Sequence, residues 1–167
     1  MTKPKWLFPT FFIWQKMEIS VEDASVRFLD ELYEIEKQSF KEEAFSKRQI
    51  AYLLADYNAI SIVARVEGKI SGFVIGRIDL VWGRPVGHIM TLDVAPTLRR
   101  RGVATRLMLE TEKILRQKGI RECFLEVREN NVAALGLYTK LGYCRVSDLE
   151  HYYGREHGLY LRKTLIL

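Results

Sequence analysis

An acidic side chain stands inside an apolar stretch of the sequence, where a charge is costly. Glu126 lies between Leu125 and Val127 in a run that alternates like a strand. A lone carboxylate in such surroundings is expected to be paired or to take part in a reaction, which makes Glu126 a candidate general base. Periodicity alone favours the first explanation, an ion pair with Arg128 or Arg77.

A basic turn is the second feature that could do chemistry. Arg99, Arg100 and Arg101 come directly before Gly102, at the predicted start of a long helix. A helix N-terminus offers unpaired N–H groups and the positive end of the helix dipole, so it can bind phosphate. Gly102 lets the backbone approach such a ligand, and Ala104 keeps the first turn small. The spacing predicts a phosphate site, with a solvated basic turn as the alternative.

The elements on either side position this turn. Residues 88–94 are rich in apolar and β-branched side chains, and Pro96 ends this strand because proline cannot donate to a sheet ladder. Apolar residues then recur at helical spacing over 103–118, and Gly119 ends the helix. The basic turn therefore lies where a strand passes into a helix.

The remaining periodicity predicts a mixed sheet with several helices. Strands are expected over 17–21, 59–66, 70–78, 122–127, 143–149 and 159–166, and helices over 25–38, 46–55 and 132–141. Ser46 and Gln49 form a capping box at the start of the second helix. Residues 67–69 read as a hairpin turn, and residues 80–85 as a loop. This order of strands and crossovers predicts an α/β fold.

The composition is that of a globular protein of one domain. The chain has 167 residues, of which 48% are hydrophobic and 28% charged, and its formal net charge is +5. This mild positive charge favours acidic ligands but is too small to indicate nucleic-acid binding. A nucleic-acid site would also need aromatic platforms beside Arg99–Arg101, which the sequence lacks.

The cysteines and the first residues bear on the compartment. Cys123 and Cys144 lack metal-ligand spacing and are expected to be reduced, mostly buried thiols of a cytoplasmic protein, with a disulfide as the alternative. Residues 1–16 are apolar and aromatic, but the run is too short to span a bilayer and lacks a cleavage site. An upstream start, a packing arm or a dimer contact would each explain this extension, and no membrane partner is expected.

Two motifs resemble those of a known superfamily. The basic turn matches the acyl-CoA signature Arg/Gln-x-x-Gly-x-Gly/Ala of the GNAT acetyltransferases, here Arg99-x-x-Gly102-x-Ala104. Residues 125–138, followed by 141–143, resemble the other half of that superfamily's CoA site. Together they resemble the RimI-like branch and its archaeal and eukaryotic relatives, which acetylate protein N-termini.

The resemblance covers about residues 17–165 and predicts a GNAT N-acetyltransferase domain over 17–167, preceded by the extension 1–16. It implies the GNAT acyl-CoA N-acyltransferase fold of the α+β class. We expect a mixed, mostly antiparallel sheet of about six to seven strands, flanked by about four helices, with splayed central strands.

The resemblance implies acetyl-CoA as the co-substrate and no metal ion. The residues that match the CoA site are Leu92, Asp93, Val94, Arg99, Arg100, Arg101, Gly102, Val103, Ala104, Thr105, Asn131 and Tyr138. In the family the end of the preceding strand pairs with the pantetheine, so an N–H near Val94 is expected to polarise the thioester carbonyl. Apart from the resemblance, Asn131 is explained as a helix N-cap.

Two residues match the acid and the base of the family. Glu126 matches the acidic catalytic residue of RimI-like enzymes and is expected to act through water. Tyr138 matches a tyrosine beside the CoA sulfur that protonates the leaving thiolate, which a phenol with a pKa of about 10 can do at neutral pH. One helical turn after Ala134, Tyr138 is otherwise explained as a core anchor.

The residues that match the substrate site are Phe40, Glu42, His88, Tyr152 and Tyr153, with Phe45 in the same first loop as Phe40. The two tyrosines resemble the pair that holds the substrate backbone in N-terminal acetyltransferases, with packing at a hairpin tip as the alternative. His88 is expected to be a strand histidine with satisfied hydrogen bonds, or to share a proton relay with Glu126.

An α-amine suits a site with one carboxylate base. Its pKa is about 8 and that of lysine about 10.4, a difference of about 3 kcal/mol in reaching the neutral form. The sequence therefore predicts an acetyl-CoA-dependent Nα-acetyltransferase of protein N-termini, ribosomal proteins included, acting by direct attack in a ternary complex. We expect a monomer or weak homodimer.

Three alternatives remain open at this point. The enzyme could acetylate a small amine or a lysine side chain, although the paired tyrosines suit an extended peptide better. The chain could also be a non-catalytic acyl-CoA-binding module, which the retained Glu126 and Tyr138 argue against. A basic nucleic-acid-binding domain is the third.

Overall fold

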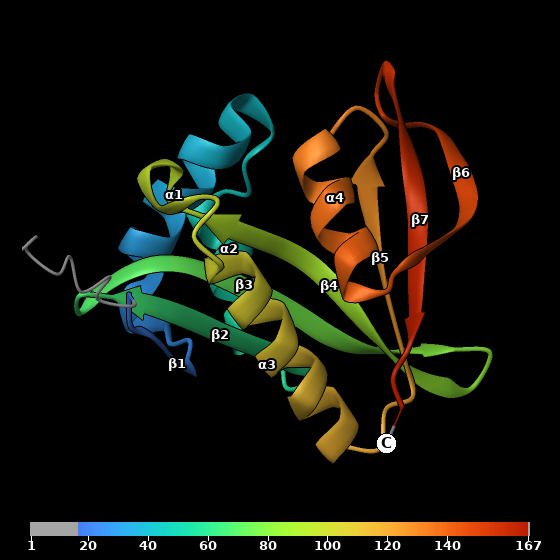
Figure 1. The fold of residues 1–167 in the computed structure, drawn as a ribbon, viewed down its shortest axis with the longest axis horizontal. Helices are drawn as coiled ribbons and strands as arrows, with labels where there is room; N and C mark the ends of the chain where they lie inside the picture. The colour runs from blue at the N-terminus through green and yellow to red at the C-terminus, as the bar shows by residue number, and fades with distance from the viewer. Residues whose placement is uncertain (1–16, 167) are drawn as a thin grey trace, which may run out of the picture.

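The structure, a computed structural model, describes residues 17–166, and within them seven strands form one sheet with the order β1-β2-β3-β4-β5-β7-β6 (Figure 1). The strands are β1 (Ile19–Asp23), β2 (Ala59–Val66), β3 (Lys69–Val81), β4 (Arg84–Val94), β5 (Glu122–Arg128), β6 (Cys144–Tyr153) and β7 (Glu156–Thr164). Neighbouring strands are antiparallel, except β4 and β5, which are parallel. The predicted mixed, mostly antiparallel sheet is confirmed.

Four α-helices cover the two faces of this sheet. They are α1 (Leu29–Phe40), α2 (Lys47–Ala55), α3 (Val103–Gln117) and α4 (Val132–Leu141), and short 3₁₀ turns are η1 (Val26–Phe28), η2 (Lys41–Glu43) and η3 (Pro96–Leu98). α3 and α4 lie on one face, where Val74, Leu107 and Leu125 belong to the larger core. α1 and α2 lie on the other, where Leu32 and Phe73 are fully buried.

The capping residues set the ends of the helices. The capping box of Ser46 and Gln49 is present at the start of α2. α3 begins after Gly102, whose φ of 86° a residue with a Cβ rarely adopts. Asn131 caps α4 by accepting the N–H of Ala134 at 3.1 Å. The predicted bounds of α3 and α4 are confirmed to within one residue.

The predicted loop over residues 80–85 is wrong. β3 and β4 stay paired down to Val81 and Arg84, so the connection is a two-residue hairpin turn at Trp82 and Gly83. Both have positive φ, 52° and 75°, as such tight turns require. The continuous hairpin fixes which side chains of β3 lie next to those of β4.

β4 and β5 form a ladder at only one end. They pair at three positions, Gly87 with Cys123, His88 with Phe124 and Ile89 with Leu125. Beyond these pairs the strands diverge, and in β4 the pairing with β3 skips Met90, which is a bulge. The predicted splay of the central strands is confirmed (Figure 1).

Both cysteines are free, Cys123 buried and Cys144 exposed, so the expectation that the two are mostly buried is wrong for Cys144. Within residues 17–166, no helix is both long and apolar enough to cross a membrane. The predicted N-terminal extension, residues 1–16, lies outside the described residues.

Candidate active site

A cavity of about 410 Å³ occupies the split between β4 and β5. Its lining residues are Glu36, Phe40, Glu43, Phe45, Ile89, Met90, Thr91, Leu92, Leu125, Glu126, Val127, Arg128, Asn131, Ala134, Tyr138 and Tyr153. Half of them come from β4 and β5, and Tyr153 comes from β6. The others come from α1 and the segment after it on one face of the sheet, and from α4 and its N-cap on the other. Groups bound against either face can therefore meet in this cavity.

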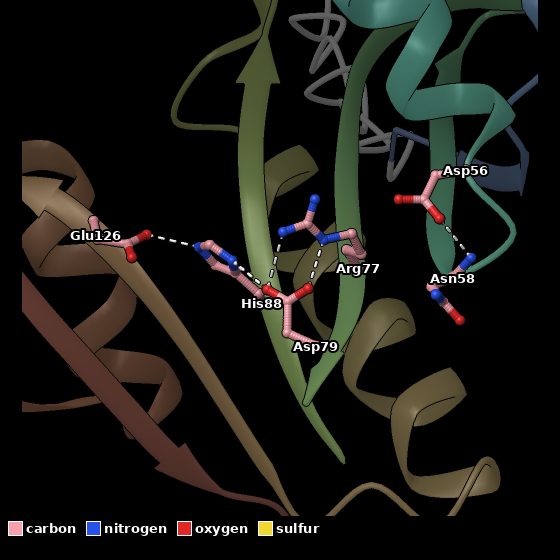
Figure 2. A network of polar contacts seen from close by, with 6 residues as sticks. All are labelled: Asp56, Asn58, Arg77, Asp79, His88 and Glu126. Carbon is pink, nitrogen blue, oxygen red and sulfur yellow. Dashed lines mark hydrogen bonds and ion pairs between the residues drawn. The ribbon is translucent and has the colours of Figure 1, made fainter. Parts of the chain in front are cut away.

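Glu126 stands at the end of a chain of four side chains (Figure 2). Its Oε2 lies 2.7 Å from Nε2 of His88, and Nδ1 of His88 lies 3.0 Å from Oδ2 of Asp79. Arg77 donates to Asp79 through Nε at 2.6 Å and through Nη2 at 3.2 Å. Arg77, named as a direct partner of Glu126, thus reaches it only through two intervening side chains, and Arg128 binds other carboxylates.

Acidic and basic side chains alternate along this chain. Burial favours the neutral ring of His88, but the hydrogen bonds and charges of Glu126 and Asp79 outweigh it and raise its pKa. Burial also disfavours the charged form of Asp79, yet the hydrogen bonds from Arg77 and His88 lower its pKa below the ordinary value. The two acidic neighbours of His88 therefore favour its protonated form.

Packing fixes the ring of His88 as well. It stacks on Phe124 with centroids 4.2 Å apart and planes at 19°, and Phe124 in turn lies 5.2 Å from Tyr160. His88 does not line the cavity itself. Its place is behind Glu126, so it acts on that carboxylate rather than in the open space.

Tyr138 reaches the cavity from α4. Its side chain is buried and packs edge-on against Tyr143, with centroids 5.8 Å apart. Burial is the main reason that the pKa of Tyr138 lies well above its ordinary value. Asn131 lines the same cavity while its Oδ1 caps α4. Tyr138 is thus both a core anchor and a group at the cavity.

The basic turn is divided between two tasks. Arg99 donates through Nε to the carbonyl of Val94 at 3.1 Å and through Nη2 to Oγ of Ser39 at 3.2 Å. Arg100 and Arg101 are exposed. Gly102 gives α3 no side-chain cap, so the N–H groups of its first turn, over 103–105, remain available. An uncapped N-terminus beside two exposed arginines fits a phosphate-bearing ligand.

At the end of β4, successive side chains point to opposite faces of the sheet. Leu92 lines the cavity, and Val94 belongs to the core under α3. Asp93 points to the other face, where its Oδ2 accepts the hydroxyl of Thr91 at 2.7 Å. Its side chain is therefore not on the face of the α3 N-terminus, which leaves only its backbone to contact a ligand there.

The predicted substrate residues are partly brought together. Phe40 and Tyr153 line the cavity, and Phe45 lies beside them. Glu42 and Tyr152 do not line it, and Tyr152 is 53% exposed. Burial raises the pKa of Tyr153 to about 12.

Several residues of the site were not anticipated. Asp79 carries no signal until the hairpin register places it diagonally opposite His88. Glu36 carries no signal beyond its place in the predicted helix over 25–38, yet it is buried at the cavity. Glu43 was overlooked beside Glu42. Among residues 17–166, no group of three or more His, Cys, Asp or Glu side chains is arranged to hold a metal ion.

Comparison with known proteins adds independent information. The model of the acetyltransferase (GNAT) family matches residues 28–143. The N-alpha-acetyltransferase of Sulfurisphaera tokodaii is 30% identical over 155 residues, which cover 86% of this chain and 91% of the relative. The N-alpha-acetyltransferase of Sulfolobus acidocaldarius is 28% identical over 158 residues, covering 88% and 92%.

Solved structures share the fold. Ard1 from Thermoplasma volcanium gives a TM-score of 0.81 at 23% identity, covering 89% of this chain and 99% of that one. The ribosomal-protein-S18-alanine N-acetyltransferase from Escherichia coli gives 0.80 at 22% identity, covering 90% and 96%. With the family match over most of the chain and a relative 30% identical along nearly its full length, this protein is an acyltransferase that belongs to the GNAT acetyltransferase family.

Proposed function

We propose that this enzyme transfers the acetyl group of acetyl-CoA to the N-terminal α-amine of proteins, by direct attack within a ternary complex. The observation that carries the proposal is the cavity itself, where Glu126 approaches from β5 and Tyr138 from α4. The names of the two archaeal relatives, both N-alpha-acetyltransferases, support the α-amine as the acceptor.

Glu126 is proposed as the general base. It takes a proton from the α-ammonium through a water molecule, and the neutral amine then attacks the thioester carbonyl. His88 holds the carboxylate in place at 2.7 Å. The electrostatic partner explains how a carboxylate is kept in an otherwise apolar strand.

Tyr138 is proposed as the general acid. A C–N bond forms while the C–S bond breaks; the nitrogen gives up its second proton to solvent, and the departing sulfur needs a proton, which solvent then returns to the donor. Burial raises the pKa of Tyr138, so the phenol is protonated at neutral pH before the sulfur departs. Tyr138 and Glu126 line one cavity, so both proton transfers take place at one reacting centre.

Acetyl-CoA supplies the activated acetyl group. We propose that the N–H groups of 103–105, with Arg100 and Arg101, bind its phosphates. Leu92 and the backbone of Val94 would lie along the pantetheine, and Asn131 beside it. Arg99 contributes by holding the carbonyl of Val94.

The polypeptide is proposed to bind between the segment after α1 and the β6–β7 hairpin. Phe40 and Phe45 form one wall, and Tyr153 the other. Glu42 and Tyr152, outside the cavity, would meet residues farther along the substrate. The chain carries both halves of the cavity, which supports a monomer as the active unit, and its free thiols support the reducing cytoplasm.

The test measures thiol release from acetyl-CoA with short peptides that begin with Ser, Ala, Met-Glu or Met-Leu. An N-blocked lysine peptide and spermidine serve as alternative acceptors. Turnover is expected with free N-termini only. Tyr138→Phe is expected to lower kcat about 10- to 100-fold by removing the acid, without raising the KM for acetyl-CoA more than about twofold.

Each other outcome points elsewhere. Turnover with spermidine alone would show that the acceptor is a small amine and not a protein N-terminus. Tight binding of CoA with no turnover on any acceptor would show that the protein is a CoA-binding module and not an enzyme.

A further inference from the structure

Arg128, the last residue of β5, has partners on both sides of the cavity. Its guanidinium forms ion pairs with Glu43 of η2 and with Glu156 of β7. Its Cζ also lies 4.4 Å from the ring centroid of Tyr153. β5 pairs with β7 at Arg128 and Gly158, so Glu156 belongs to the same half of the molecule as Arg128, whereas Glu43 belongs to the other half.

The segment that carries Glu43 is tied to the β4 side through α1. Phe45 donates its N–H to Oε1 of Glu36 at 2.9 Å. Lys41 has φ 51° and ψ −114°, a backbone region that residues with a side chain disfavour, so this conformation depends on tertiary contacts. Among the hydrogen bonds and ion pairs of residues 17–166, the Glu43–Arg128 pair is the one that joins residues 41–46 to β5, β6 or β7.

We infer that the ion pair between Arg128 and Glu43 is a latch across the mouth of the cavity, which sets the separation of the two walls that hold the polypeptide. This inference rests on the proposed function. Both side chains line the cavity, and the latch joins the wall of Phe45 to the wall of Tyr153. A groove that is ordered before the substrate arrives binds it more tightly, because less ordering accompanies binding.

Arg128 is therefore a positioning residue for the substrate. Its position on β5 is two residues beyond Glu126, on the same face of the strand and about 7 Å farther along. The latch thus closes beside the residue that meets the α-amine. It leaves the CoA side, at α3 and α4, untouched.

The two partners of Arg128 provide matched variants. Glu43→Gln removes the ion pair that crosses the cavity, and Glu156→Gln removes the one that stays within one half. We expect Glu43→Gln to raise the KM for a peptide about three- to fivefold, as half-exposed ion pairs allow. Glu156→Gln is expected to change it less than about twofold. Neither changes kcat or the KM for acetyl-CoA.

Two further measurements separate a latch from a general loss of structure. Salt screens half-exposed charges, so the peptide KM of the native enzyme is expected to rise between low and high NaCl, and that of Glu43→Gln to stay flatter. The double exchange of Glu43→Arg with Arg128→Glu restores opposite charges across the cavity. It is expected to recover part of the peptide affinity that Arg128→Glu alone loses, because Glu156 still faces a like charge at position 128.

Amide hydrogen exchange tests the latch without relying on the reaction. Exchange in residues 41–46 is expected to quicken in Glu43→Gln and not in Glu156→Gln. If no peptide is acetylated but this difference is present, the proposed function fails and the latch stands. Equal peptide KM values for the two variants, or a lower KM for Glu43→Gln than for the native enzyme, would overturn the latch.

Discussion

Of the carboxylates that line the cavity, Glu36 and Glu126 approach it from opposite sides and have contrasting surroundings. Glu126 on β5 meets the imidazole of His88, which is backed by Asp79 and Arg77. Glu36 on α1 is 1% exposed and meets a second acid, Asp93, across the hydroxyl of Thr91.

The difference is one of charge balance. Around Glu126 positive and negative groups alternate. Around Glu36, burial and then the charge of Asp93 raise its pKa to about 8, and burial raises the pKa of Asp93 as well. The single hydrogen of Thr91 cannot serve both acids, so one of them must keep a proton. The same side-chain type is thus held ready for proton transfer on one wall and held neutral on the other.

Replacing each acid by its neutral isostere gives the largest expected contrast. Glu126→Gln removes the base and is expected to lower kcat about 100- to 1,000-fold. Glu36→Gln mimics the protonated form that the fold already favours, and an amide can still accept the N–H of Phe45. It is expected to change kcat less than about twofold. Steady-state kinetics on one peptide measures both, and similar losses would mean that both acids take part in the reaction.

Asp79→Asn tests the chain of side chains behind Glu126, because Asp79 contacts His88 and not Glu126 itself. The variant loses a charge-assisted hydrogen bond to His88, worth about 1.4 kcal/mol, so kcat is expected to fall about tenfold. The pKa of His88, followed by NMR, is expected to fall because one of the two acids that raise it is gone. Asp79→Glu is the control and is expected to restore part of both.

For the same variant, the direction in which the loss of Tm changes with pH can be measured. A raised pKa of His88 stabilises the fold fully below its unfolded value of about 6.5, and this is lost as pH rises through the folded value. The Tm deficit of Asp79→Asn is therefore expected to be larger at pH 6 than at pH 9. A deficit that grows with pH would contradict the alternating charges.

Glu36 gives an expected effect on stability alone, with the same direction of pH dependence as that of His88. Its folded pKa of about 8 exceeds the ordinary 4.5, so between these values the folded protein binds more protons than the unfolded chain. Stability from this group therefore falls as pH rises across that window. Glu36→Gln should remove this slope, so its Tm relative to the native protein is expected to increase by about 10 °C from pH 5 to pH 9. Parallel curves would show that Glu36 is ionised throughout.

Local signals predicted the helices around the site closely. Gly102 and Gly119 were the signals for the bounds of α3, and Asn131 for the start of α4. These residues act on their own neighbours, so their effect can be read along the chain. The splay of the strands came from the resemblance, since nothing in the periodicity of 88–94 shows where a ladder ends.

Pairing across strands was the part that the sequence left undetermined. The turn at Trp82 and Gly83 lacks the usual Asn-Gly or Asp-Gly signal, so the hairpin was taken for a loop. Without the register of β3 and β4, the sequence does not show that Asp79 lies beside His88. Glu126 could be recognised as a carboxylate that needed a partner, but both cations named for it pair elsewhere in the structure.

The short ladder between β4 and β5 leaves the two parts of the sheet joined by few backbone hydrogen bonds. In the sheet, β1–β4 and β5–β7 are joined by three residue pairs, with α3 as the connection between them. Partial opening along this seam would break few backbone hydrogen bonds, whereas full separation would also expose the core that Val74 and Leu125 share. Anything bound in the split touches both parts and favours the closed state by mass action. Bound substrates would thus hold the two parts together, and they are expected to slow hydrogen exchange in β5 and α4 more than in β2 and β3.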